Sequence, residues 1–452
     1  MLKKFTRIDS TPSGKPLEAA PEVGAGETDA FTPDLYTIRL KVQQRLEALA
    51  SGHHDIRQIP QIEQKIETYL DEVLAQGGVG LTGTERQRLL SLVQADILGY
   101  GPLQPLLDDE SINEIMVNKY DEIFVERGGL IEPTPAHFEN EAHLMRIVER
   151  MVAHVGRRVD QSSPMVNARL PHGYRLNAII RPLAVDGPVV TIRKFARTPF
   201  TAQDLINNGT LTPQFTAFLK ACVEARINIV ISGATGTGKT TMLNIASGFI
   251  PARERIVTIE DTAELQLKQK HIVRLEARPP DIEEKGEITI RQLLINALRM
   301  RPDRIIVGEC RSGEALDMLQ AMNTGHDGSI TTVHSNSPRD TLRRIELMTL
   351  MSGLDLSSRA IREMIASAIE LIVHVDRLRD GSRKVAQATE VNGMEGDVIR
   401  MTDLFVFDQS APPQKGQVVG MLKPTGLLPK FDHKFAKNNV SLAKSLFTAS
   451  AL

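Results

Sequence analysis

The segment from Ile231 to Leu243, ISGATGTGKTTML, contains the pattern G-x-x-x-x-G-K-T. Gly233, Gly238, Lys239 and Thr240 occupy its fixed places. The residues that lead into it, INIVIS, predict a buried strand, and KTTMLNIASGFI, which follows from Lys239, predicts a helix. A glycine-rich turn can arise by chance, but a complete motif between a strand and a helix favours a phosphate-binding loop.

Each part of this loop has a chemical reason. Its glycines let backbone N–H groups turn toward phosphate oxygens, and the positive end of the following helix faces the same anion. Lys239 is expected to reach the β- and γ-phosphates, and the Thr240 hydroxyl to bind Mg²⁺. The cofactors predicted are a nucleoside triphosphate and Mg²⁺. The expected nucleotide-binding residues here are Gly233, Ala234, Thr235, Gly236, Thr237, Gly238, Lys239, Thr240 and Thr241.

Length and composition limit what surrounds the loop. A chain of 452 residues with 41% hydrophobic and 24% charged residues predicts two or three globular domains. Lys and Arg number 54 against 56 Asp and Glu, so net charge gives no support for coating a polyanion. The two cysteines suit a reducing compartment and cannot form a four-cysteine zinc site. MLKKFTR has no apolar core behind it and no run is long enough to span a bilayer, so we expect a cytoplasmic protein.

The chain divides into regions of different pattern. Residues 1–33 are rich in Pro, Gly, Ala, Ser and Glu, which predicts a disordered tail. Residues 34–99 contain three segments with apolar spacings of three and four, which predicts a three-helix bundle. Residues 100–197 mix strand and helix patterns and predict a small α/β, PAS-like domain. Residues 198–214 have the turn residues of a linker.

From about residue 215 the chain alternates strands and helices. The apolar strands INIVIS, RIVTIE, RIIVGE and SITTVH alternate with helical segments, which predicts a mostly parallel sheet covered by helices. The fold class expected is therefore α/β, with a RecA-like P-loop domain over residues 215–452. IELIVHVDRLRDGSRKVAQATEV predicts a hairpin that turns at Asp380-Gly381.

Hydrolysis needs a carboxylate that orients water and ligands for the metal. RIVTIEDTAEL places Glu260, Asp261 and Glu264 after one strand, and RIIVGECR places Glu309 at the end of another. Acidic residues after strands are commonly solvated caps. Their position after two apolar strands downstream of one phosphate-binding loop favours a role at the site, because ligands bind at the carboxyl edge of such sheets.

Four segments together resemble the ATPase family of type II and type IV secretion and type IV pili. They are GATGTGKTT, IEDTAEL, RPDRIIVGECR and GHDGSITTVHSNSP, which match the family's Walker A, Asp, Walker B and His boxes. The resemblance implies ATP as the nucleotide. It implies that Glu264 orients water, that Glu309 supports Mg²⁺ and water, and that His334 senses the γ-phosphate. From the residues alone, His334 could equally cap the turn at SNSP.

Within that family the chain is most similar to the Flp, or tight-adherence, pilus assembly ATPase of the CpaF type. ILGYGPLQPLLDDESINEIMVN, ARLPHGYRLNAIIRPLAVDGPVVTIRKF and VRLEARPP carry this resemblance. The family works as a homohexamer with nucleotide between its two domains, which implies that Arg175 and Arg193 contact the γ-phosphate. Arginines of this kind are otherwise a solvated basic face.

The resemblance implies a motor that acts on an inner-membrane platform protein and adds pilin subunits to a filament or removes them. The protein is then peripheral to the cytoplasmic face of the inner membrane through its partners. One alternative is a type IV secretion ATPase that transports protein or DNA. A nucleic-acid motor is the less favoured alternative, since charge is near neutral, aromatic residues make up 4% and Trp is absent. We expect no nucleic-acid partner.

Overall fold

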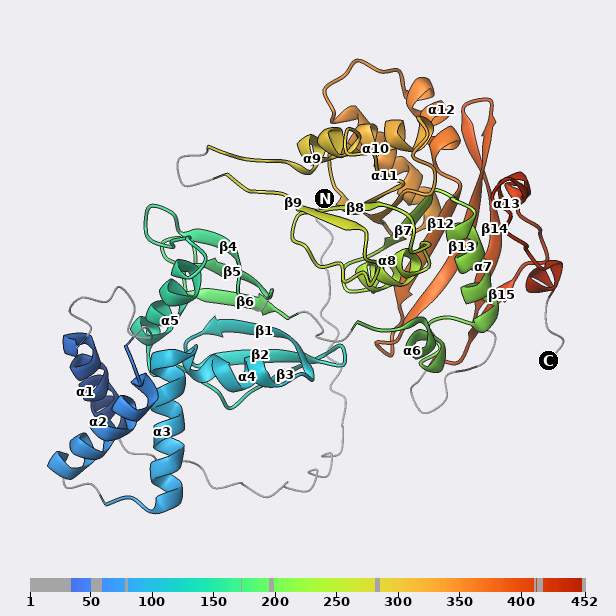
Figure 1. Cartoon of the computed structure of the whole chain (residues 1–452). Coiled ribbons are helices and arrows are strands. Elements are labelled where there is room, and N and C mark those ends of the chain that lie inside the picture. Colours follow the sequence, from blue (N-terminus) through green and yellow to red (C-terminus); the bar gives the residue numbers. More distant parts are fainter. Residues whose placement is uncertain are drawn as a thin grey trace, which may run out of the picture. The chain divides into compact units, whose positions relative to one another are not determined.

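Figure 1 shows the protein as a computed structural model. It describes residues 34–49, 59–77, 80–171, 173–194, 199–280, 285–409, 412 and 418–448. The tail predicted to be disordered, residues 1–33, lies outside these ranges. The chain forms two compact units, Met1–Gly101 and Pro102–Leu452.

The first unit contains three helices in the three segments for which helices are predicted. They are α1 (Asp34–Leu49), α2 (Ile62–Gly77) and α3 (Gly83–Leu98). Thr82 and Glu85 cap the start of α3 reciprocally, each side chain accepting the other's backbone N–H. The shared core is aliphatic and includes Val42, Leu46, Ile66, Leu70, Leu89 and Val93. A buried ion pair joins α1 to α3, from Arg39 Nε to Asp96 Oδ2 at 3.0 Å.

The second unit begins with an antiparallel sheet of six strands. Its spatial order is β3-β2-β1-β6-β5-β4, and every neighbouring pair runs antiparallel. The apolar face of α5 is buried through Leu144, Ile147, Val148 and Met151. The elements are α4 (Gln104–Asp108), β1 (Ile112–Lys119), β2 (Glu122–Arg127), β3 (Leu130–Pro133), α5 (Glu141–Ala153), β4 (Met165–Arg169), β5 (Arg175–Ile179) and β6 (Val189–Arg193).

A connecting segment, residues 199–212, follows this sheet. It contains the short helix α6 (Ala202–Asn207), and α7 (Pro213–Glu224) begins directly after it. Thr201 caps α6 by accepting the N–H of Asp204, whose carboxylate accepts the Thr201 N–H in return. The stretch predicted as a linker therefore has regular, capped structure.

A sheet of nine strands forms the centre of the remainder. Its order is β15-β14-β13-β12-β7-β11-β10-β8-β9. Neighbours from β12 through β9 are parallel, and β12 through β15 continue the sheet as antiparallel pairs. This confirms the predicted α/β class and the predicted hairpin. The strands are β7 (Ile229–Gly233), β8 (Ile256–Glu260), β9 (Ile272–Glu276), β10 (Arg304–Cys310), β11 (Ile330–His334), β12 (Leu371–Arg377), β13 (Arg383–Glu395), β14 (Val398–Asp408) and β15 (Met421–Pro424).

Helices cover both faces of this sheet, and two apolar clusters fill the space beneath them. One cluster joins α7 and α8 to one face and includes Phe215, Phe218, Phe405 and Phe447 in mutual ring contact. The other lies under α9, α10, α11 and α12 (Figure 1). The helices are α8 (Lys239–Gly248), α9 (Ile290–Ala297), α10 (Glu314–Asn323), α11 (Pro338–Leu350), α12 (Ser358–Ala368) and α13 (Asp432–Lys437). Fully burying an aromatic or aliphatic side chain stabilises a fold by roughly 1.5–3 kcal/mol, so these clusters hold the sheet and helices together.

One charged side chain is built into this interior. Arg304, at the start of β10, is fully buried and donates from Nε to Glu254 Oε2 at 2.5 Å. Its other two nitrogens donate to the carbonyls of Gly328, at 3.1 Å, and Val223, at 2.7 Å. All three guanidinium nitrogens therefore have partners, which is the condition for burying such a charge.

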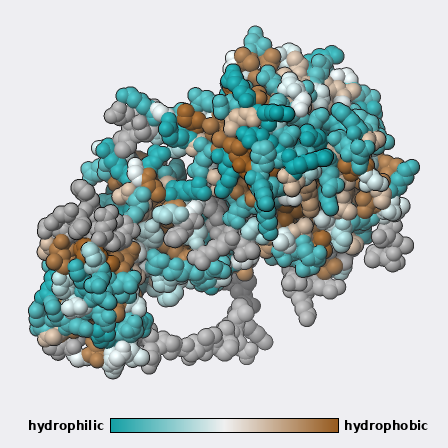
Figure 2. Space-filling view, viewed as in Figure 1, coloured by the Kyte–Doolittle hydropathy of each residue, from teal (hydrophilic) through white to brown (hydrophobic). Residues whose placement is uncertain are grey.

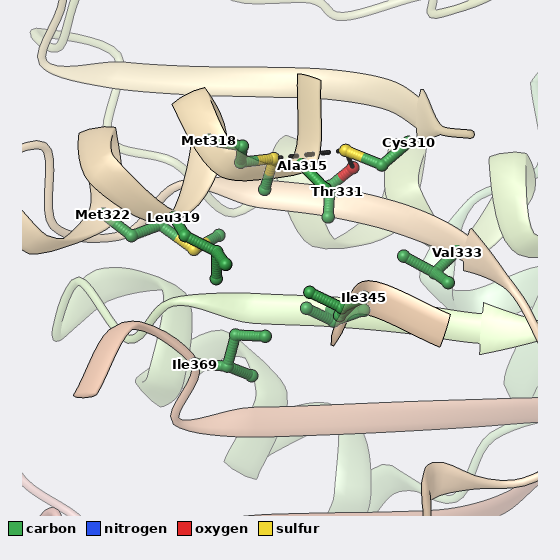
Figure 3. A pocket seen from close by; sticks show the side chains of 10 residues that line it. Cys310, Ala315, Met318, Leu319, Met322, Thr331, Val333, Ile345 and Ile369 are labelled. Atoms are coloured by element: carbon green, nitrogen blue, oxygen red, sulfur yellow. Dashed lines mark hydrogen bonds between the residues drawn. The ribbon is translucent and has the colours of Figure 1, made fainter. Parts of the chain in front are cut away.

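The visible surface is mainly hydrophilic, with hydrophobic residues in scattered groups (Figure 2). A small apolar cavity lies between the sheet and the helices that cover it, beside Cys310, Met318 and Ile345 (Figure 3). Burial raises the pKa of Cys310 to about 12, so this thiol is a packing group. No helix in the described ranges is long and apolar enough to cross a membrane.

Candidate nucleotide-binding site

Four neighbouring parallel strands carry the predicted residues at one edge of the nine-stranded sheet. In spatial order these strands are β7, β11, β10 and β8. Gly233 ends β7, His334 ends β11, Glu309 is the last but one residue of β10, and Glu260 ends β8. Gly233 and His334 are direct register partners. The carboxyl edge of parallel strands is where α/β sheets bind ligands, so the structure assembles distant segments at that edge.

The candidate phosphate loop, residues 233–241, requires glycine for steric reasons. A Cβ on Gly233 would lie 2.3 Å from the carbonyl oxygen of Val375 and 2.6 Å from Thr237 Oγ1. Gly236 and Gly238 have φ angles of 74° and 96°, which L side chains rarely adopt. The loop therefore passes close to β12 and turns back on itself just before α8.

Inside the loop, two side chains point at one carbonyl. Thr237 Oγ1 and Lys239 Nζ each donate to the oxygen of Ala234 at 2.9 Å. Burial lowers the pKa of Lys239, and the positive charges of Arg193 and Arg311 lower it further. The negative charge of Glu309 opposes this lowering. Cationic groups thus gather around the loop, and a polyphosphate is the kind of ligand that would neutralise them.

Glu260 organises the chain that carries Glu264. Its Oε2 accepts the backbone N–H groups of Glu264, at 2.8 Å, and Leu265, at 2.9 Å. Its Oε1 is buried and has no hydrogen-bond partner among the described residues. Burial raises the pKa of Glu260 to about 7, against the two N–H groups, which lower it. Glu260 is therefore a buried support for Glu264 and is not placed to take Glu264's predicted role.

Arginines of the six-stranded sheet reach the segment that follows β8. Arg175 Nη1 lies 3.3 Å from Glu264 Oε1. Arg193, on β6, is the cross-strand partner of Arg175. Arg169 pairs with Glu276 at 2.5 Å and donates to the carbonyl of Ala263 at 3.2 Å. A cleft of about 370 Å³ lies among these groups, lined by four arginines, Arg157, Arg169, Arg175 and Arg193, and by Asp261 and Glu276. Arg175 and Arg193 therefore lie on one edge of the cleft, as neighbours on paired strands.

Arg311 is a residue of this edge that the sequence did not single out. Its guanidinium donates to Glu309 Oε2 from Nε, at 2.7 Å, and to Asp261 Oδ2 from Nη1, at 2.9 Å. Its own backbone N–H donates to Glu314 Oε1 at 2.6 Å. It therefore holds together Glu309 of β10 and Asp261, which directly follows β8. Its place two residues after Glu309 is the one sequence signal that points to it.

His334 faces the same set of charges. Burial lowers its pKa, and Lys239, Arg344 and Arg311 lower it further, while Glu309 opposes them. The imidazole is consequently neutral at neutral pH, and it can accept a proton when an anion arrives beside it.

Thr240 and Glu309 were predicted as metal ligands. Thr240 lies in the first turn of α8, and Glu309 lies close enough to Lys239 for its charge to oppose the lowering of the Lys239 pKa. A hydroxyl and a carboxylate are oxygen ligands of the type Mg²⁺ takes together with water and phosphate. Among the described residues no three His, Cys, Asp or Glu side chains are grouped to hold a metal alone. The residues present fit an ion that is bound largely through a nucleotide.

Residues 96–403 match the model of the type II/IV secretion system protein family, and residues 35–98 match the N-terminal domain of type II secretion system protein E. The chain belongs to the type II/IV secretion system protein family.

Relatives of this family member include a putative conjugal transfer protein of Mycobacterium tuberculosis. It is 35% identical over 328 residues, which cover 71% of this chain and 93% of the relative. The conjugal transfer protein TrbB of Rhizobium radiobacter is 36% identical over 297 residues, covering 64% and 86%. Among solved structures, the VirB11 ATPase from the Brucella suis type IV secretion system, in complex with sulphate, is 32% identical. That match covers 64% of this chain and 91% of the other, with a TM-score of 0.36.

Proposed function

We propose that this member of the family hydrolyses ATP at the edge formed by β7, β11, β10 and β8. The observation that carries the proposal is the meeting of a glycine-dependent loop, Lys239, Glu309 and His334 on adjacent strands. Lys239 and the loop N–H groups bind the phosphates, and Thr240 and Glu309 hold Mg²⁺, which neutralises phosphate charge. The VirB11 relative is named an ATPase, which supports the same activity.

In this proposal Glu264 orients the attacking water. Arg175 determines when the Glu264 carboxylate is free to do so. In the structure Arg175 Nη1 lies 3.3 Å from the Glu264 carboxylate. A γ-phosphate carries more negative charge than a single carboxylate and is a stronger partner for a guanidinium, so it draws Arg175 away and frees Glu264. Arg193 joins Arg175 on the phosphate in this proposal, which their direct pairing across β5 and β6 supports.

The work driven by hydrolysis is assembly of a Flp-type pilus by a homohexamer. The motor turns or pushes an inner-membrane platform protein from the cytoplasmic face and so adds pilin subunits or removes them. The CpaF-like stretches at residues 97–118, 168–195 and 273–280 support this proposal.

A second candidate is transport of protein or DNA substrates by a type IV secretion system. It has specific support, because two relatives are named conjugal transfer proteins and a third is a type IV secretion ATPase. In that case the same hydrolysis acts on a transfer channel in place of a pilus platform.

ATP hydrolysis by the purified full-length chain tests the first step. Lys239→Ala should reduce turnover by about 100-fold or more, because it removes the cation that contacts the transferred phosphate. Lys268→Ala, which removes an exposed lysine after β8, is the matched control and should retain wild-type turnover. Equal turnover by wild type and Lys239→Ala would refute the proposed site.

Cells that carry only Lys239→Ala at wild-type protein level then separate the two machines. Loss of surface filaments in electron micrographs would assign the motor to pilus assembly. Normal filaments with loss of substrate or DNA transfer would assign it to secretion. Normal filaments and normal transfer would contradict both assignments.

A further inference from the structure

The turn between β12 and β13 lies against the phosphate loop through Arg383. The proposed hydrolysis assigns no role to this contact. Arg383, the first residue of β13, donates from Nε to the carbonyl oxygen of Gly236 at 2.8 Å. Its Cδ lies 3.5 Å from the position that a Cβ on Gly238 would take. The side chain therefore packs along the two glycines that shape the loop.

The turn that presents Arg383 is held firmly. Asp380 Oδ1 accepts from the N–H and the hydroxyl of Ser382, at 3.0 and 2.7 Å, and its Oδ2 accepts from the N–H of Val418 at 2.7 Å. The N–H of Leu378 closes the turn by donating to the Ser382 carbonyl at 2.8 Å. Arg383 thus extends from a fixed turn and not from a loose loop.

The backbone at the same point holds the connecting segment. Thr210 Oγ1 donates to the carbonyl of Arg383 at 2.8 Å, and the N–H of Val385 donates to the carbonyl of Thr210 at 3.2 Å. Between them, Lys384 Nζ donates to the carbonyls of Asn208, at 3.1 Å, and Gly209, at 2.9 Å. Three successive residues of β13 therefore bind three successive residues that follow α6.

The charges around Arg383 are unbalanced. Its nearest carboxylate is that of Glu126, whose Oε1 lies 3.9 Å from Nη2. Burial lowers the pKa of Arg383, and Arg377 and Arg193 lower it further, with Glu126 opposing them. A half-buried guanidinium among like charges is attracted by any anion that enters the adjacent loop.

We propose that Arg383 is a positioning residue that ties the state of the phosphate loop to the connecting segment. The inference rests on the proposed function, because it requires a nucleotide in the loop. A bound polyphosphate fixes the Gly236 peptide and attracts the Arg383 side chain, so the start of β13 is held more tightly. Because the Arg383 carbonyl and the Val385 N–H bind Thr210, the segment before α7 is held with it. Nucleotide binding is thereby transmitted to the chain that joins the two sheets.

Hydrogen exchange of the full-length chain tests this link directly, with and without ADP and Mg²⁺ as the probe. In wild type, nucleotide should slow exchange of the Thr210, Leu211 and Val385 amides by about threefold or more, since each hydrogen bond made firmer is worth a factor of about 2–10. Arg383→Met should abolish this slowing when nucleotide is saturating, while the amides of α8 still respond. Arg383→Lys, which keeps the charge but loses the planar fork, should retain less than half of it.

Thr210→Val provides a variant that leaves the loop untouched. It deletes the hydroxyl bond to the Arg383 carbonyl and should leave ADP affinity within about twofold of wild type, while weakening the slowing at residues 210–211. Thr216→Val deletes an equivalent hydroxyl bond within α7, to the Thr212 carbonyl at 2.9 Å, and should leave the response intact. This variant controls for the loss of a hydroxyl.

The possible outcomes distinguish a failure of the Arg383 link from a failure of the proposed nucleotide site. If ADP slows exchange in α8 but not at residues 210, 211 and 385, the link is refuted and the nucleotide site stands. The same conclusion follows if Arg383→Met or Thr210→Val responds as wild type does. If ADP changes no amide in α8, the proposed nucleotide site fails and this inference fails with it.

Discussion

Replacing the buried Glu260 by Gln should stabilise the protein at high pH and hardly at all at low pH. The Glu260 side chain is buried, one of its oxygens has no partner among the described residues, and burial raises its pKa from 4.5 to about 7. A raised pKa means that the folded protein binds the proton more tightly than the unfolded chain. The stability this contributes is fully present below about pH 4.5 and is lost as pH rises through about 7. Glutamine is uncharged at every pH, so the variant does not lose stability at this position as pH rises.

The size of the effect follows from that shift. A pKa raised from 4.5 to about 7 corresponds to about 3 kcal/mol over the full range. Between about pH 5 and about pH 8 the linkage relation yields most of that total, roughly 2–3 kcal/mol. The stability of Glu260→Gln relative to wild type should rise by this amount across the window. The glutamine keeps one acceptor oxygen for the N–H groups of Glu264 and Leu265.

Thermal unfolding of both proteins at a series of pH values measures this difference. Because a large unit gains about 2 °C or less per kcal/mol, the variant should gain a few degrees in Tm between about pH 5 and about pH 8. Glu287→Gln, on an exposed side chain, controls for the loss of one negative charge. Tm curves for wild type and Glu260→Gln that run parallel across the window would refute the assignment of a raised pKa to this carboxyl.

Three further predictions concern other parts of the second unit. Gly328→Ala should lower stability by about 3 kcal/mol or more, measured by urea unfolding, because its Cβ would lie 1.8 Å from Nη1 of the buried Arg304; unchanged stability would contradict the packing described. Arg175→Ala should reduce kcat by about 10–1,000-fold with a smaller change in KM, since a cation on the γ-phosphate most strongly stabilises the charge of the transition state; an effect on KM alone would restrict it to substrate binding. The pKa of His334, followed by NMR, should lie below its ordinary value without nucleotide and rise when ATP binds to a Glu264→Gln variant; a pKa that ATP does not raise would remove His334 from the phosphate.

The strands that bear the motifs could be predicted from sequence because they are continuous apolar runs. β7 and β8 are buried at all five positions, and their composition alone distinguishes them from loops. β4, β5 and β9 were not predicted, since they are short and partly exposed and carry Asn, Ala and Arg at positions where apolar residues would reveal a strand. Strands of this composition form because neighbouring strands offer backbone hydrogen bonds, which the local sequence does not reveal.

The candidate residues were predicted one motif at a time, and their spatial relations were not. The order β7-β11-β10-β8 differs from chain order, so the pairing of Gly233 with His334 has no local signal. Arg311 acts on Asp261, fifty residues earlier in the chain, and Arg383 acts on Gly236 across a much longer separation. Charged residues beside a turn usually face solvent, so nothing in the sequence RLRDGSRK distinguishes Arg383 from its neighbours.

The length of the turn between β12 and β13 has a consequence for the evolution of this family member. Side chains alternate between the two faces of a strand, so inserting or deleting one residue ahead of Arg383 would send its side chain to the opposite face. The Arg383 carbonyl, which accepts the Thr210 hydroxyl, would at the same time turn to the other side of the strand, and the carbonyl of an adjacent residue would take its place. Changes of even length preserve this parity and changes of odd length destroy it. Loop lengths here should therefore vary in steps of two among sequences that keep the arginine.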